Sequence, residues 1–198
     1  MKSYKASAIV VAMYFAMCMA AFGQGGGQSS SAAPTIASVL DRQLSGIERE
    51  VMAAAEAVPE DKYDFSPATS NIPGDFKTPE PVRTMSQQFR HVAQTLEYYA
   101  DLALGEKPPA EGDENGPKNV KTKSDVINYL KADFAKAHTA INTITMQNAV
   151  EPLAGGQRTR LGLAVGMVGH TNNHYGQIIE YLRMNGMVPS ESQPKPKK

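Results

Sequence analysis

The sequence predicts an all-α protein, a four-helix bundle with long crossover loops. Three observations support this fold class. Long segments repeat apolar residues at helical spacing, and no stretch alternates apolar and polar residues as a strand does. Stretches rich in proline and glycine separate these segments. A chain of 198 residues is long enough for one core, and four amphipathic helices bury their apolar stripes against one another in a bundle.

The first 23 residues predict a secretory signal peptide. Lys2 and Lys5 form a short basic region, an apolar run continues to Phe22, and small residues precede a cut that leaves Gln24 first. The run has about 17 residues, at the lower end of what spans a bilayer. We therefore expect cleavage, no stable membrane insertion afterwards, and a mature protein that is periplasmic or secreted.

Composition excludes several functions of the mature chain. The one cysteine, Cys18, lies in the apolar run, so the mature chain contains no cysteine. It can therefore form no disulfide, and it has no thiolate ligand or cysteine nucleophile. Any bound metal is then held by nitrogen and oxygen atoms. The chain has 20 basic and 20 acidic residues and no basic face or arm, which argues against nucleic-acid binding.

Two flanking segments are predicted to lie outside the domain. Residues 24–34 are rich in glycine, glutamine and serine and form a flexible linker. Residues 190–198 form a polar, proline-rich, disordered tail. The bundle is therefore expected over residues 35–189.

The first two helices are predicted from start and stop signals. The first runs from Thr35, its N-cap, to Val58, where a proline follows. The connection 59–81 is long and carries aromatic residues, and such loops are usually functional or docked on the surface. The second helix is predicted over residues 82–104 and ends at Gly105.

The last two helices follow a polar crossover at residues 106–123. The third helix is predicted to begin with Ser124 as its cap, because an apolar residue recurs every three or four positions after it. The fourth helix is predicted over residues 157–184 and closes at Asn185-Gly186.

The fourth helix carries His170 and His174, four residues apart. This spacing places their Cβ atoms about 5–6 Å apart on one face, so each imidazole can offer a nitrogen to one ion at about 2.0–2.1 Å. Leu163, Met167 and Ile178 share that face, and a polar group in an apolar stripe needs a partner. The segment lacks the glutamate of HExxH, which argues against a zincin protease.

Two further histidines lie on other predicted helices. His91 falls at the boundary between the apolar stripe and the polar face of the second helix. On that helix alone, a surface histidine is the simpler interpretation, although the boundary also suits a groove that substrate can reach. His138 flanks the stripe of the third helix without a second ligand near it in sequence, so we interpret it as structural or exposed.

One histidine in the second helix followed by HxxxH in the fourth resembles the DinB-like (DinB/YfiT-like) family of metal-dependent enzymes. The resemblance is carried by these segments: residues 52–65, 82–105 and 169–189. It extends over residues 35–189 and implies a four-helix bundle that holds a divalent ion through His91, His170 and His174.

The resemblance also implies cofactors. The family's metals include zinc, nickel and iron, and imidazole suits all three. Its characterised members are largely transferases and isomerases that use a low-molecular-weight thiol such as bacillithiol, mycothiol or glutathione. Those relatives work in the cytoplasm, whereas this chain is expected to be exported.

Three imidazoles leave an ion at least one position for water or substrate, as catalytic sites require. A metal-dependent transferase or hydrolase acting on a small molecule therefore competes with a non-catalytic secreted metal-binding or stress-related protein. A partner-binding bundle with core histidines is a third alternative. No acidic residue is placed as a base, and the oligomeric state, monomer or homodimer, stays open. The helical projection places these residues around the histidines: Gln88, Asn173, Gln177 and Tyr181.

Overall fold

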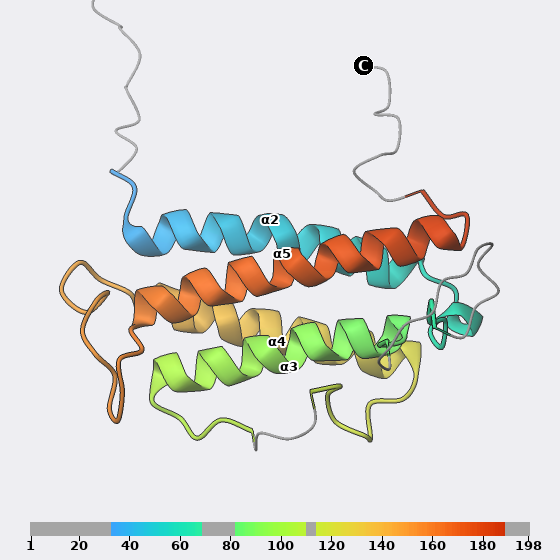
Figure 1. Ribbon diagram of the computed structural model, residues 1–198. Helices are drawn as coiled ribbons and strands as arrows, with labels where there is room; N and C mark the ends of the chain where they lie inside the picture. The colour runs from blue at the N-terminus through green and yellow to red at the C-terminus, as the bar shows by residue number, and fades with distance from the viewer. Residues whose placement is uncertain (1–32, 69–81, 110–113, 189–198) are drawn as a thin grey trace, which may run out of the picture. The chain divides into compact units, whose positions relative to one another are not determined.

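The structure is a computed structural model that describes residues 33–68, 82–109 and 114–188 (Figure 1). The predicted signal peptide, nearly all of the linker and the C-terminal tail lie outside these residues. The second half of the connection between the first two helices, residues 69–81, lies outside them as well. The described helices all belong to the compact unit that begins at Pro34.

Four α-helices form the described part of the chain, which contains no strand. Their bounds, with one short 3-10 helix, are α2 Ile36–Ala57, η1 Glu60–Lys62, α3 Met85–Leu104, α4 Lys123–Asn142 and α5 Arg160–Met184. The predicted all-α, four-helix fold is therefore confirmed. None of these helices is both long and apolar enough to span a membrane.

A threonine caps the start of each of the four described α-helices. The hydroxyls of Thr35, Thr84, Thr122 and Thr159 each accept a hydrogen bond from the main-chain N–H three residues later, which satisfies one of the free donors of the first turn. Thr35 was predicted as a cap. Ser124 was wrong: α4 begins two residues earlier, because Thr122 and the residue three positions on form a reciprocal capping box.

The starts of α3 and α5 also differ slightly from the predicted ones. α3 begins at Met85 instead of residue 82, and α5 begins at Arg160 instead of residue 157. In both cases the helix starts directly after a capping threonine. The predicted end of α3 is confirmed, since Gly105 adopts the left-handed conformation (φ 76°) that commonly closes a helix.

Consecutive helices α2 and α3 lie diagonally across the bundle. Each packs against both α4 and α5, and α4 and α5 meet only slightly. Figure 1 shows α2 and α5 running from left to right and α3 and α4 from right to left. α3 is therefore antiparallel to α5 and parallel to α4, so the chain between α3 and α4 must return along the bundle.

The core runs along the axis of this bundle. Its largest fully buried apolar side chains come from all four helices and include Leu44, Phe89, Phe134 and Ile178. They occupy the apolar stripes that predicted the helices, because residues three and four apart share one helix face. The antiparallel packing of α3 on α5 then brings the first half of α3 beside the middle and second half of α5.

Candidate metal centre

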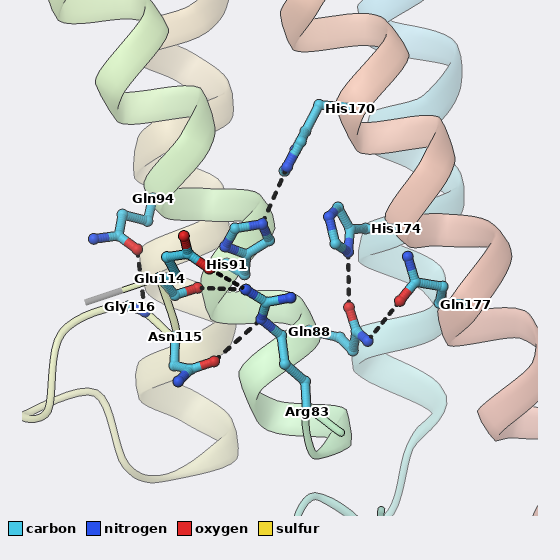
Figure 2. Close-up of polar contacts among 10 residues, drawn as sticks. All are labelled: Arg83, Gln88, His91, Gln94, Glu114, Asn115, Gly116, His170, His174 and Gln177. Carbon is cyan, nitrogen blue, oxygen red and sulfur yellow. Dashed lines mark hydrogen bonds and ion pairs between the residues drawn. The ribbon is translucent and has the colours of Figure 1, made fainter. Parts of the chain in front are cut away.

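His91 on α3 and His170 and His174 on α5 converge where these two helices pack (Figure 2). We call them the histidine triad. Each offers one nitrogen, and the three nitrogens lie within 4.8 Å of one another. The Nε2 atoms of His91 and His170 are 3.1 Å apart. The structure thus brings together all three residues that the sequence analysis selected.

The spacing of the His91 and His170 nitrogens fits a shared ion. Two nitrogens that each lie about 2.05 Å from one ion at a tetrahedral angle are about 3.3 Å apart. The 3.1 Å between the His91 and His170 Nε2 atoms is close to that value. The ring centroids are also close, at 4.4 Å for His170 and His174 and 4.6 Å for His91 and His174. The donor set therefore suits a divalent ion that accepts imidazole nitrogen.

The triad has electrically neutral rings at neutral pH. Burial, followed by the neighbouring histidines and Arg83, lowers the pKa of His174 to about 3. Burial, His91 and Arg83 lower the pKa of His170 to about 4. Burial and Arg83 also lower the pKa of His91, against a smaller opposing effect of Glu114. Neutral imidazole is the form that binds metal.

Gln88 orients His174 through a buried hydrogen bond of 2.8 Å between Gln88 Oε1 and His174 Nδ1. The Gln88 amide nitrogen donates to Gln177 Oε1 at 2.9 Å and lies 3.4 Å from the Tyr181 hydroxyl. The Gln88 oxygen therefore faces the imidazole, so Nδ1 carries the proton. His174 Nε2 keeps its lone pair for a ligand, the arrangement in which a second partner sets the tautomer of a metal-binding histidine.

Three of the four residues predicted around the triad belong to this network, namely Gln88, Gln177 and Tyr181. The Tyr181 hydroxyl donates to the carbonyl of Arg83 at 3.0 Å, which ties the start of α3 to α5. Asn173 was wrong. It precedes His174 by one position, a rotation of about 100° around the helix, and its side chain lies on the exposed face.

The chain before α4 packs against α3 next to His91. Gln94 Oε1 accepts the Gly116 N–H at 3.2 Å, and Arg90 Nη1 donates to the carbonyls of Pro117 and Val120, both at 3.2 Å. Gly116 has φ 74°, and a Cβ there would lie 2.7 Å from Arg90 Cβ. This part of the crossover is therefore docked, and it forms one border of the site.

Arg83 is the residue near the site that the sequence analysis missed. Its Nε donates to Asn115 Oδ1 at 3.1 Å, and its Nη2 donates to Glu114 Oε2 at 3.1 Å. Arg83 precedes the cap of α3, so no helical period relates it to His91. Its partners lie about 30 residues away in a loop. No sequence pattern predicts that Arg83 contacts Glu114 and Asn115.

His138 lies apart from the triad, between α4 and α2. Its Nδ1 is 2.6 Å from Asp41 Oδ1, and its Nε2 is 3.0 Å from Glu48 Oε2. Burial disfavours the charged ring, but the hydrogen bonds to the two carboxylates outweigh it and raise the pKa of His138. Of the two interpretations given for His138, structural or exposed, these contacts agree with the structural one.

Three imidazoles that converge from two helices of a four-helix bundle could hold a metal ion. Comparison with known families agrees with the helical fold. The sequence profile of the DinB superfamily matches residues 43–178, a span that includes the whole triad and more than half of the 198 residues. The chain belongs to the DinB superfamily. No match to a curated protein was found.

Proposed function

We propose that this protein binds one divalent metal ion through His91, His170 and His174 and is a metal-dependent transferase or hydrolase for a small molecule. The observation that carries the proposal is the convergence of three imidazole nitrogens within 4.8 Å. A structural zinc site has four protein ligands, whereas three are typical of catalytic sites with an open position.

An ion held by three neutral ligands keeps its full charge and can acidify a bound water or attract a substrate oxygen or thiolate. The residues of the chain prepare this site. Gln88 presents the lone pair of His174 inward. His174 is only 6% exposed, whereas His91 and His170 are partly exposed. We expect the substrate to approach from the side of these two less buried rings.

Metal content tests the ligand assignment. The protein and single alanine variants of the triad are loaded with zinc, nickel or iron(II), dialysed and measured by elemental analysis. We expect about one ion per chain in the wild type and loss of most of it in each triad variant. His138→Ala is the matched control, because His138 is also a helical, partly buried histidine with two polar contacts. If His138→Ala strips the ion as thoroughly as His174→Ala does, the assignment is wrong.

A non-catalytic metal-binding protein is the second candidate. One observation favours it: among the described residues, no carboxylate hydrogen-bonds a triad histidine, and Glu114 is instead paired with Arg83. Cobalt-substituted protein separates the two candidates. A spectrum that responds to small ligands, together with turnover in thiol-transfer or esterase screens, supports the enzyme. An unresponsive spectrum without turnover supports the binding protein.

We also propose that the protein is exported after cleavage of residues 1–23. The basic and apolar segments at the start of the sequence support this. N-terminal sequencing of protein from its native compartment should begin at or near Gln24. Recovery of the full-length chain from the cytoplasm would contradict export.

A further inference from the structure

Arg83 places a positive charge next to the histidine triad. Its side chain is 25% exposed, and it contributes to the lowered pKa of all three histidines. Figure 2 shows its guanidinium below His91, with Glu114 and Asn115 on one side and a terminal nitrogen directed away from them. The guanidinium is thus held at the edge of the site by the loop.

One terminal nitrogen of this guanidinium has no partner among the residues that the structure describes. Nε and Nη2 make the contacts to Asn115 and Glu114, whereas Nη1 makes no hydrogen bond within the described part of the chain. The Glu114 carboxylate is 82% exposed, so water competes for it and the pair is weak. Arg83 can therefore donate to another acceptor without releasing the loop.

Attachment of the loop does not require Arg83. The same loop is already held on α3 by Arg90, through two carbonyls, and by Gln94. A guanidinium beside a site for a divalent cation also repels that cation, since like charges in a partly buried site are poorly screened. The repulsion is relieved when an anion lies between the two positive charges.

We infer that Arg83 is the anion-binding residue of the proposed metal centre, and that the small molecule bound there carries a carboxylate that accepts from Arg83 Nη1 while another atom is directed to the ion. Guanidinium suits this role because its planar donors match carboxylate geometry. The inference rests on the proposed metal centre and adds the charge of the substrate to it.

Two kinds of thiol test the inference on cobalt-loaded protein. 2-Mercaptoethanol is neutral apart from its thiol, whereas mercaptoacetate and 3-mercaptopropionate add a carboxylate at two distances. Each is titrated by absorbance into the wild type, Arg83→Gln and the control Arg183→Gln. The control removes an equal charge from an exposed ion pair at the end of α5.

The measured quantity is the affinity for the better carboxylate thiol divided by the affinity for 2-mercaptoethanol. This ratio should fall about tenfold in Arg83→Gln, the size of effect expected from a hydrogen bond to a charged group, and should stay unchanged in Arg183→Gln. An unchanged ratio in Arg83→Gln, with cobalt content and circular dichroism equal to the wild type, overturns the inference. Failure of the wild type to bind cobalt contradicts the proposed metal centre instead. Failure of any thiol to alter the cobalt spectrum contradicts the proposed open position on the ion.

Glu114→Gln provides an independent test that leaves Arg83 in place. It removes the competing carboxylate, so carboxylate thiols should bind more tightly while 2-mercaptoethanol binds as before. If Arg83→Gln does not fold, Glu114→Gln alone tests the inference. Unchanged or weaker binding of both carboxylate thiols in Glu114→Gln then overturns the inference.

Discussion

Gln88→Leu tests how the protein prepares His174 for metal. Gln88 is 2% exposed and His174 is 6% exposed, so water cannot replace the 2.8 Å hydrogen bond between them. With leucine at position 88, the metal-bound protein must keep the His174 Nδ1–H buried without an acceptor. The metal-free protein avoids this cost by moving the proton to Nε2. The penalty therefore falls mainly on the metal-bound state.

The magnitude follows from that difference. A buried donor without a partner costs about 1–3 kcal/mol, which corresponds to a loss of affinity of about 5- to 150-fold. The range agrees with the roughly 10- to 100-fold effect typical of residues that orient metal ligands. Competition against a chelator of known affinity measures it, with metal-free unfolding in urea as the check on stability.

Gln177→Leu is the matched control for this experiment. Gln177 contacts Gln88 but makes no hydrogen bond to a triad histidine, so its removal should weaken metal binding far less. Affinities of Gln88→Leu and wild type within about threefold of each other, well below the effect expected from the lost acceptor, would refute the reasoning. Equal losses in both variants would show that the glutamine network acts only through general packing.

Three further predictions use other features. The pKa values of His170 and His174 are lowered to about 4 and about 3, so the protein should retain its metal below pH 6.5, where ordinary histidines become protonated. Metal content measured against pH checks this, and release with a midpoint near pH 6.5 would contradict these shifts. Since the pKa of His138 is raised, its stabilising effect is complete below about pH 6.5 and is lost as pH rises through the raised pKa, so His138→Ala should cost more unfolding free energy in urea at pH 6 than at pH 9. Gly116→Ala should destabilise more than Gly105→Ala, because both have positive φ, which costs about 1–2 kcal/mol, but only the first also places a Cβ against a neighbouring side chain; equal melting temperatures would argue against the docked crossover.

The sequence predicted the helices better than their starts. Apolar spacing extends over whole helices, so the four elements were recognised, whereas a start depends on one side-chain hydrogen bond. Ser124 and Thr122 are equally plausible caps by residue type. The reciprocal hydrogen bonds between Thr122 and Asp125 make Thr122 the cap. The periodic spacing of apolar residues carries no information about these local bonds.

The candidate site also contains residues that helical spacing predicted and residues that it did not. His170 and His174 are related by helical spacing, and the resemblance added His91, which the pattern of α3 alone did not select. Gln88 and Tyr181 also followed from helical projection. Arg83 did not, because it reaches the site through a loop whose path no periodicity describes. Contacts between segments about 30 or more residues apart are set by packing, which a single sequence does not display.

The division of the triad between α3 and α5 has a consequence for assembly. Two of its members lie on α5 and the third lies 79 residues before His170, so the full ligand set exists only once α5 has been synthesised and has docked on α3. A bound ion would then stabilise the packing of α3 against α5, since the free energy of metal binding adds to the stability of the arrangement that creates the site. A polypeptide truncated before α5 would have a single ligand and no means of selecting an ion. If the proposed export precedes folding, the metal supply at the destination, and not at the place of synthesis, would decide which ion the protein carries.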